Sequence, residues 1–300
     1  MVTLRVSGMA KDHVPGSYYY LHVQDVNGYE WHPFSVAGAR SELGGPVEVT
    51  FHIKSSTLPD SWTSSLRGLV GRNSASHGEV APSEVSQHDS LRPKLYVSLD
   101  GPYGSMNVDA HSYRYVVMVA GGIGITPFLH LLKLLSKQIP LVGGGREAEV
   151  IWVMREEGLW KALGSELVEA VKLSDGRLSV RVQVYITGRD AHPLPTVSGV
   201  RAVSGVHESR AGVTYGAVST VDKGLGHDDP VVIEGVTVNY GGRPHITRLL
   251  LDLLTARQYS ASNSKEFCVL ACGPSALSQV VSNVSFRVGV DFHLEQFSFS

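Results

Sequence analysis

The pattern of apolar and polar residues changes near residue 112. Before that point, short runs rich in aromatic and β-branched residues are separated by turns containing Gly, Pro, Asn or Asp. Such runs are typical of antiparallel strands. They occupy residues 18–23, 47–53 and 95–99. The pattern predicts a small antiparallel β-barrel over residues 1–109.

After residue 112, apolar runs alternate with amphipathic segments. The run 115–120 is continuously apolar, as expected of a parallel strand that is buried on both faces. The sequence predicts further strands at 150–154, 181–186 and 267–271, and helices that begin near residues 160, 244 and 274. Alternating strands and helices predict a second domain, an α/β Rossmann-like domain with a parallel sheet, over residues 110–300.

Two stretches interrupt these patterns. Residues 71–93 are rich in Ser, Gly, His and Glu, and residues 190–230 are long, polar and glycine-rich. Neither carries a chemical motif. We therefore expect both to be disordered insertions, although long loops can also be functional.

Composition excludes several classes of protein. The 26 basic and 28 acidic residues give a net charge of −2, which offers no electrostatic reason to bind nucleic acid or an anionic membrane. The most apolar window, 116–135, is broken by glycines, Pro127 and charged residues, so it is typical of a strand and a helix rather than a membrane span. No signal peptide is evident, and we expect this chain by itself to be soluble.

The two cysteines, Cys268 and Cys272, fall on or beside one predicted strand. Four residues of strand at about 3.3 Å each separate them too widely for a disulfide. The sequence predicts no cysteine metal site, and we expect no metal ligand set elsewhere.

The most specific local signal is the run Gly121–Phe128, Gly-Gly-Ile-Gly-Ile-Thr-Pro-Phe, between a predicted strand and a predicted helix. Thr126 can cap that helix, and Pro127 suits its first turn. A glycine turn that leads into a helix N-terminus presents backbone N–H groups to a phosphate. The run therefore favours a dinucleotide pyrophosphate site, although glycine turns of this kind also have purely structural uses.

Three further motifs do not indicate a function when each is taken alone. His32-Pro33-Phe34-Ser35 can be a turn beside a core Phe, Asp100–Gly104 can be a turn between domains, and Cys272-Gly273-Pro274 can be a strand-to-helix turn. Their order along the chain, with Gly121–Phe128 between the last two, resembles the ferredoxin–NADP reductase superfamily. The His-Pro-Phe-Ser form resembles its ferric reductase and NADPH oxidase branch. The resemblance spans nearly the whole chain apart from the two polar stretches.

The resemblance implies that the barrel binds FAD. Phe34 would lie against the flavin ring and Ser35 near its reactive nitrogen, which suits an aromatic face and a small hydroxyl. The implied FAD residues are His32, Pro33, Phe34, Ser35, His52, Ile53, Lys54, Trp62 and Thr63. For Lys54, a solvated strand position is an equally good interpretation.

The resemblance also implies that the second domain binds NADPH. Gly121, Gly122, Gly124, Thr126 and Pro127 would line the pyrophosphate turn, and Cys272, Gly273 and Pro274 would lie by the nicotinamide. Cys272 and Ser35 would take part in catalysis.

A C-terminal aromatic residue would cover the flavin, and both Phe297 and Phe299 fit that role. Arg155 would meet the 2′-phosphate and favour NADPH, whereas Glu156 and Glu157, which follow it, would favour NADH. Arg243 matches another position of the family near the nucleotide.

The implied activity is hydride transfer from NADPH to FAD, followed by single-electron transfer to haem in a transmembrane partner domain. The final acceptor, a ferric chelate or oxygen, would be chosen outside this chain, which would lie on the cytosolic face of a membrane. We expect either an excised or separately encoded dehydrogenase portion, or a relative that works alone. A free-standing soluble flavin reductase and a non-catalytic module with the same fold stay open as alternatives.

Overall fold

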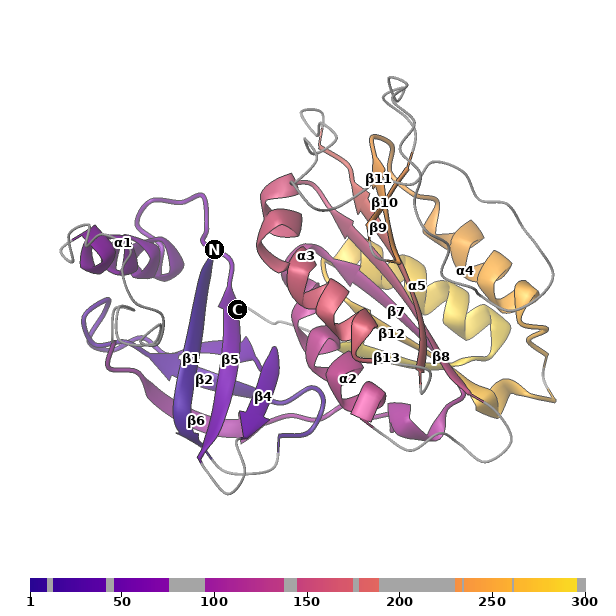
Figure 1. Cartoon of the computed structure of the whole chain (residues 1–300), viewed down its shortest axis with the longest axis horizontal. Helices are drawn as coiled ribbons and strands as arrows, with labels where there is room; N and C mark the ends of the chain where they lie inside the picture. The colour runs from indigo at the N-terminus through magenta and orange to yellow at the C-terminus, as the bar shows by residue number, and fades with distance from the viewer. Residues whose placement is uncertain are drawn as a thin grey trace, which may run out of the picture. The chain divides into compact units, whose positions relative to one another are not determined.

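The computed structural model describes residues 1–9, 13–41, 46–75, 95–137, 145–174, 178–188, 230–233, 235–260 and 262–295. The chain divides into two compact units, Met1–Ser105 and Met106–Ser300, which are described separately (Figure 1). Most of the two predicted insertions, residues 76–93 and 190–229, lies outside the described residues. The first insertion was placed too early, because residues 71–75 form the last turn of a helix.

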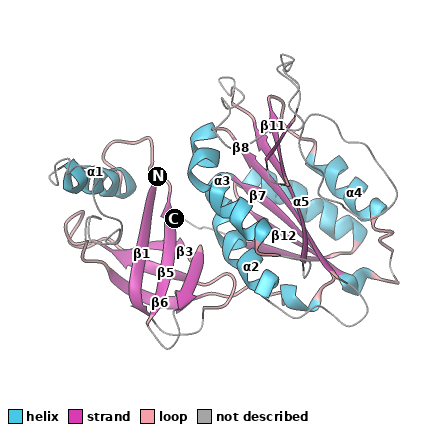
Figure 2. Ribbon diagram, viewed as in Figure 1, coloured by secondary structure: helices cyan, strands magenta, loops and turns pink. Residues whose placement is uncertain are grey.

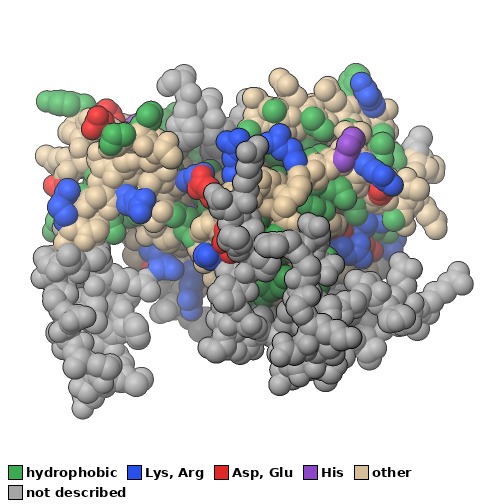
Figure 3. All heavy atoms as spheres, turned by 90° about the horizontal axis from the view of Figure 1, so that it is seen from above, with side chains coloured by type: hydrophobic (Ala, Val, Ile, Leu, Met, Phe, Trp, Pro, Cys, Tyr) green, Lys and Arg blue, Asp and Glu red, His purple; other side chains and the backbone are tan. Residues whose placement is uncertain are grey.

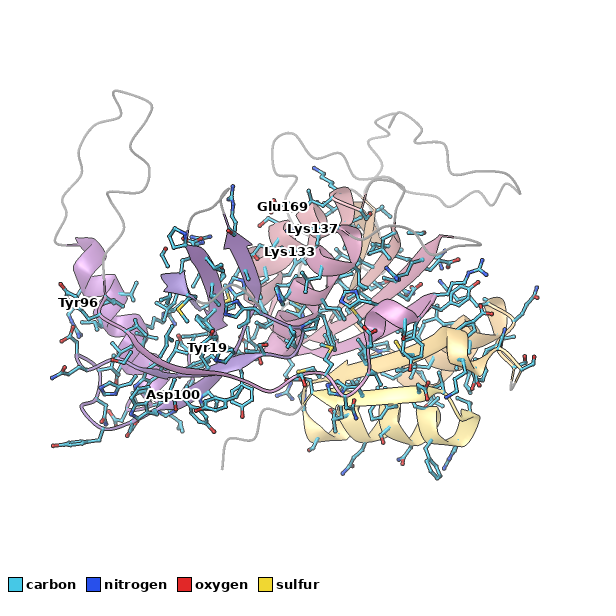
Figure 4. The ribbon with its side chains drawn as sticks, turned by 90° about the horizontal axis from the view of Figure 1, so that it is seen from below. Tyr19, Tyr96, Asp100, Lys133, Lys137 and Glu169 are labelled. Atoms are coloured by element: carbon cyan, nitrogen blue, oxygen red, sulfur yellow. The ribbon has the colours of Figure 1, made fainter. Side chains whose placement is uncertain are left out.

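The described residues of the first unit form two three-stranded antiparallel sheets and one helix (Figure 2). One sheet has the order β1 (Val2–Met9), β5 (Val47–Ile53), β4 (Gly38–Ser41), and the other β3 (His32–Ser35), β2 (Tyr18–His22), β6 (Ser98–Tyr103). Helix α1 spans Trp62–Ala75. Alternate residues of the strands, among them Tyr19, Leu21, Phe51 and Ile53, form the core of this unit. Figure 4 labels Tyr19, which is 1% exposed, and Tyr96, which is 93% exposed.

The motif Asp100–Gly104 is not the turn that the sequence predicts. Residues 100–103 continue strand β6, and the pairing of β6 with β2 shifts between Tyr18 and Tyr20. Gly101 has φ +143°, and a Cβ there would lie 2.8 Å from the Tyr19 ring. A glycine in a strand often marks such an irregularity, because another group approaches its backbone closely.

The second unit is built on a seven-stranded sheet with the order β10-β11-β9-β8-β7-β12-β13. Its strands are β7 (Tyr115–Gly121), β8 (Arg146–Met154), β9 (Leu178–Ile186), β10 (Val231–Ile233), β11 (Val236–Tyr240), β12 (Phe267–Cys272) and β13 (Asp291–Glu295). All neighbouring strands are parallel except β10, which pairs antiparallel with β11. The predicted fold, an antiparallel domain followed by a mostly parallel α/β domain, is confirmed.

Helices cover both faces of this sheet (Figure 1). Helices α2 (Thr126–Lys137) and α3 (Glu157–Lys172) pack with each other, as do α4 (Ile246–Ala256) and α5 (Ser275–Val288). Short 3₁₀ helices η1 (Ala110–Ser112), η2 (Gly122–Ile125) and η3 (Ser264–Glu266) complete the unit. Side chains of β7 alternate between the two apolar layers, with Met118 on the α2 side and Val119 on the α4 side. This burial on both faces explains why β7 is apolar throughout.

The surface charges and the two cysteines are arranged as the sequence analysis predicts. Basic and acidic side chains of the described residues are interspersed on the face shown in Figure 3. Cys268 and Cys272 are both buried and free, as their spacing on β12 predicts. Among the described helices, none is both long enough and apolar enough to cross a bilayer.

Candidate functional site: two turns at the carboxyl edge of the sheet, and an aromatic pair in the barrel

The parallel strands of the second unit end at one edge of the sheet, and the chain order reverses between β7 and β12. From β7 the chain proceeds outward to β8 and β9, whereas β12 and β13 lie on the other side of β7. In open α/β sheets, ligands bind beyond the carboxyl ends of the strands at such a reversal. The turns that follow β7 and β12 are therefore the first place to look for a site.

These two turns pack so closely that their glycines cannot carry side chains. A Cβ on Gly121 would lie 2.5 Å from the Pro274 ring, and a Cβ on Gly124 would lie 2.5 Å from the carbonyl oxygen of Cys272. Gly273 has φ +148°, and a Cβ there would lie 2.8 Å from the Gly121 backbone nitrogen. The structure thus joins the two motifs that the sequence singled out separately.

Gly122 differs from Gly121 and Gly124, because the space beside its Cα is empty. It has φ +57°, a conformation that favours glycine, and nothing lies within 4 Å of a Cβ built there. The indole Nε1 of Trp152 on β8 donates a hydrogen bond of 2.8 Å to the Gly122 carbonyl and anchors the turn. An open, anchored glycine turn at the start of α2 fits a pyrophosphate, since backbone N–H groups and the helix dipole both favour an anion.

Thr126 does not cap α2 as the sequence predicts. The 3₁₀ helix η2 runs directly into α2, so Thr126 already has helical angles, φ −52° and ψ −53°. Its hydroxyl donates to the Ile123 carbonyl at 2.7 Å and therefore closes the turn. Pro127 follows in the first turn of α2 and is buried.

Cys272 ends β12 with its side chain fully buried. Burial, and secondarily the Glu295 carboxylate, raises the pKa of the Cys272 thiol. The thiol is therefore neutral at physiological pH, which excludes thiolate chemistry and leaves a small polarizable side chain beside the turn.

Two arginines follow the ends of strands β8 and β11, which are separated in the sheet by β9. Arg155 follows β8 and Arg243 comes three residues after β11, and both are exposed. The Thr187 hydroxyl donates to the Met154 carbonyl at 3.1 Å, and Gly188 packs against the Arg155 carbonyl, so the end of β8 is held by the end of β9. Both arginines therefore lie at the carboxyl ends of strands on the same side of β7.

The candidate flavin site lies in the first unit, where the motif His32–Ser35 forms strand β3. Phe34 is 8% exposed and stacks on Trp62, with ring centroids 5.7 Å apart and an angle of 28°. The His32 ring lies 4.7 Å from the same indole and makes a 2.9 Å hydrogen bond with the Glu30 carboxylate. The structure therefore brings His32, Phe34 and Trp62 together.

An orphaned donor supports a ligand at this aromatic cluster. The Nε1–H of Trp62 is buried and has no hydrogen-bond partner among the described residues. Leaving such a donor unpaired costs about 1–3 kcal/mol, which an acceptor atom of a ligand would offset. A flat aromatic ring system with acceptor atoms, such as a flavin, fits this set of groups.

The remaining predicted flavin residues are spread around this cluster. Ser35 and Pro33 pair with Tyr18 and Tyr20 of β2, on the opposite face from Phe34. Lys54 follows β5 and is exposed, and the Thr63 hydroxyl accepts a 2.9 Å bond from the Ser56 backbone N–H. Ile53, in contrast, belongs to the core of this unit, and His52 is buried on the opposite face of β5, with its Nδ1 3.1 Å from the Thr3 hydroxyl. Phe297 and Phe299 lie outside the described residues.

Sequence reasoning missed one group at the edge of the sheet. Parallel pairing of β12 with β13 places Glu295 opposite Cys272, and Glu295 is bonded to His293. Only the strand register reveals this carboxylate, because β13 was not predicted as a strand.

Comparison with known proteins agrees with this geometry. The family model "Ferric reductase NAD binding domain" matches residues 113–286, and the model "FAD-binding domain" matches residues 1–107.

Similarities over nearly the whole chain point the same way. NADPH oxidase 4 of Rattus norvegicus is 28% identical over 295 residues, which cover 95% of this chain and 42% of that protein. A superoxide-generating NADPH oxidase heavy chain of Dictyostelium discoideum is 24% identical over 279 residues, which cover 90% of this chain and 45% of that protein. The chain thus spans less than half the length of either relative.

Solved structures share the fold. A ferredoxin NADP⁺ reductase from Neisseria gonorrhoeae with bound FAD and NADP has a TM-score of 0.53 at 14% identity, covering 98% of this chain and 92% of that one. The flavohem-like FAD/NAD-binding domain of nitric oxide dioxygenase from Vibrio cholerae has a TM-score of 0.51 at 17% identity, covering 97% and 88%.

Proposed function

The chain belongs to the ferric reductase NAD-binding domain family, and we propose that it passes electrons from NADPH through FAD to haem in a membrane partner domain. Its two matched domains make it an NAD(P)H-dependent flavoprotein oxidoreductase module. The observation that carries the proposal is the pair of glycine turns joined at the reversal between β7 and β12.

The residues of the second unit would bind and orient the dinucleotide. The open turn at Gly122 would receive the pyrophosphate, with α2 beginning directly behind it. Cys272 and Gly273 would lie beside the nicotinamide, because small neutral residues allow two flat rings to approach. Bound FAD supplies the redox chemistry, since it accepts a hydride from the nicotinamide and releases electrons singly.

The residues of the first unit would hold the flavin. The buried pair Phe34 and Trp62, 8% and 6% exposed, would form one wall of the flavin site, and the indole Nε1–H would supply a hydrogen-bond donor. Ser35, on the opposite face of β3 from Phe34, would reach the reactive nitrogen only at the edge of the strand, and Lys54 would lie near the phosphates. Phe297 or Phe299 would cover the flavin until the nicotinamide arrives.

Two arginines support a preference for NADPH over NADH. Arg155 and Arg243 are exposed cations beyond the ends of β8 and β11, where the 2′-phosphate of the adenosine would lie. Glu156 follows Arg155 in the sequence, and its negative charge would weaken the attraction of Arg155 for the 2′-phosphate. The preference for NADPH would therefore need both Arg155 and Arg243.

The acceptor is inferred from the relatives. Both of these relatives carry the name NADPH oxidase, and this chain matches less than half of each. In the complete system the acceptor would be haem of a transmembrane partner domain, and the chain would lie on the cytosolic face of that membrane. Electrons would then reach a ferric chelate or oxygen.

The test is anaerobic mixing of the FAD-loaded chain with NADPH and, separately, with NADH. The flavin absorbance should bleach with both nucleotides and faster with NADPH, and Arg155→Ala should narrow that difference. Flavin that binds but stays oxidised with both nucleotides would contradict the proposal and indicate a non-catalytic module. Rapid turnover with quinones or dyes, without reduction of b-type haem in a membrane fraction, would instead indicate a free-standing flavin reductase.

The flavin site has a test of its own. Trp62→Phe removes the orphaned Nε1–H but keeps an aromatic ring, so FAD should dissociate more readily from this variant. Trp31→Phe is the matched control, because Trp31 is exposed and stacks on His22 rather than on Phe34. Equal FAD retention by the two variants would exclude the Trp62 Nε1–H as a hydrogen-bond donor to the flavin.

A further inference from the structure

Strand β13, the edge strand beside β12, carries three polar residues on one face. Asp291, His293 and Glu295 alternate with Phe292 and Leu294 and are paired in register with Cys268, Leu270 and Cys272. His293 is 7% exposed, and its side chain is not used in the proposed electron transfer. Burying a polar group of this kind is costly unless hydrogen bonds compensate.

The segment that enters the second unit supplies those bonds. The Tyr113 hydroxyl donates to Asp291 at 2.8 Å, at the start of β13. Earlier in the same segment, Asn107 meets Nδ1 of His293 through its backbone N–H, at 3.3 Å, and through its side-chain oxygen. The other ring nitrogen, Nε2, lies 3.0 Å from the Glu295 carboxylate. A continuous chain of hydrogen bonds therefore runs from Asn107 through His293 to Glu295.

Opposite an ionised Glu295, this hydrogen-bond chain fixes the position of one proton. If Nδ1 accepts from the Asn107 backbone N–H, the neutral ring carries its proton on Nε2. If Nδ1 instead donates to the Asn107 side-chain oxygen, the ring is a cation with both nitrogens protonated. An ionised carboxylate can only accept, so in either arrangement Nε2–H donates to Glu295. His293 thus acts as a fixed donor that holds one oxygen of the carboxylate.

Glu295 is held at the position where charge matters for the proposed reaction. It pairs with Cys272, and the field of its carboxylate contributes to raising the pKa of that buried thiol. NADPH bound here would leave a cationic nicotinamide ring after giving its hydride to FAD, and a carboxylate fixed beside Cys272 would favour that change more than a mobile one. The benefit depends on orientation before the reaction begins, and His293 provides that orientation.

We propose that His293 is a positioning residue, which through its Nε2–H holds the Glu295 carboxylate beside Cys272 for hydride transfer. This inference rests on the proposed function. It assigns His293 no contact with the cofactors, and its whole effect passes through Glu295.

The experiment is a double-mutant cycle on the FAD-loaded chain, read as the limiting rate of anaerobic flavin reduction by NADPH and, separately, as the NADPH concentration at half that rate. His293→Leu should slow the limiting rate about tenfold, as expected for losing one hydrogen bond to a charged group, with little change in the half-saturating concentration. His293→Gln retains an amide donor near the place of Nε2 and should recover most of the rate. Adding His293→Leu to Glu295→Gln should cause little further loss, because both changes remove the same interaction.

Tyr113→Phe is the matched control, since it removes a hydrogen bond to the same strand at the opposite end. It should lower stability without slowing the limiting rate. If Tyr113→Phe slows flavin reduction as much as His293→Leu, or if the effects of His293→Leu and Glu295→Gln multiply, the positioning role is wrong.

A second measurement keeps the inference separate from the proposed function. In ¹⁵N-imidazole NMR spectra of the chain, His293 should show a protonated Nε2 whose signal shifts on Glu295→Gln. If NADPH never reduces the flavin of the parent chain, the proposed function is wrong. The NMR spectrum then still tests whether His293 Nε2–H donates to Glu295. An unprotonated Nε2, or a signal insensitive to Glu295→Gln, would overturn the inference.

Discussion

Replacing Gly124 by Ala tests the joined turns directly. The added Cβ would lie 2.5 Å from the carbonyl oxygen of Cys272, 2.7 Å from its carbonyl carbon and 3.0 Å from its Sγ. Two of these three atoms are backbone at the end of a buried strand, so no flexible side chain can move aside. Either the turn after β7 or the end of β12 must shift.

The expected loss of stability follows from the steric conflict alone. Gly124 does not have a positive φ, so alanine adds no backbone strain there. Overpacking a well-packed site costs about 1–3 kcal/mol, and a conflict with rigid backbone belongs near about 3 kcal/mol. For a domain of this size that loss lowers the melting temperature by about 6–12 °C. NADPH should also bind more weakly, because the shift opens the turn that receives the pyrophosphate.

The assay is thermal unfolding together with the NADPH concentration that half-saturates flavin reduction. Gly158→Ala is the matched control, since Gly158 lies in helix α3 and nothing is within 4 Å of a Cβ built there. Ala in a helix should stabilise the chain by about 0.5–1 kcal/mol and leave NADPH binding unchanged. A Gly124→Ala variant with the melting temperature and NADPH affinity of its parent would refute the close packing of the two turns.

Three further predictions concern other buried groups. Cys272→Ala should slow flavin reduction several-fold and leave FAD binding nearly intact, and equal rates in stopped-flow traces would remove Cys272 from the site. Glu149 is 1% exposed and accepts bonds from Arg257 at 3.1 Å and from Gln183 at 3.0 Å, so Glu149→Ala should cost about 3 kcal/mol in urea unfolding. A loss as small as that of Glu147→Ala, whose side chain is 38% exposed, would show that the buried network contributes little. Burial and the hydrogen bond to Asp291 raise the pKa of Tyr113 to about 12, so the folded state keeps this proton longer than the unfolded state and stability falls between about pH 10 and pH 12. Tyr113→Phe should flatten that part of the pH profile, and an unchanged slope in unfolding experiments would exclude Tyr113 as its source.

The elements that the sequence predicts well are those with one dominant physical signal. Strands such as 115–120 and 267–271 are apolar throughout because helices cover both faces of the sheet, and the structure confirms both with shifts of one residue. Helix α4 is confirmed for a similar reason, since its apolar residues recur at helical spacing and Leu250, Leu253 and Leu254 are buried.

The errors arise where a residue's local preference differs from its tertiary setting. Gly101 and Pro102 favour a turn, yet the close approach of Tyr19 makes this a distorted strand. Thr126 is a good capping residue, but a 3₁₀ turn already occupies the place where a cap would act. Strand β11 was not predicted: it begins only three residues after the end of the three-residue strand β10, so the two strands form one short apolar run in the sequence.

The candidate site shows the same division. The glycine and Cys-Gly-Pro motifs could be recognised one by one, because each is local in the chain. Their contact with each other, and the position of Glu295 beside Cys272, depend on strand order and register. Neither property is encoded in a single segment.

The most direct test of the account is the isotope effect on flavin bleaching when the FAD-loaded chain is mixed anaerobically with NADPH deuterated at the transferred position of C4. If the nicotinamide gives its hydride to the flavin, bleaching should be markedly slower with the deuterated nucleotide. The same rate with both nucleotides, at saturating concentration and with chemistry rather than binding limiting the rate, would contradict hydride transfer, as would flavin that remains oxidised.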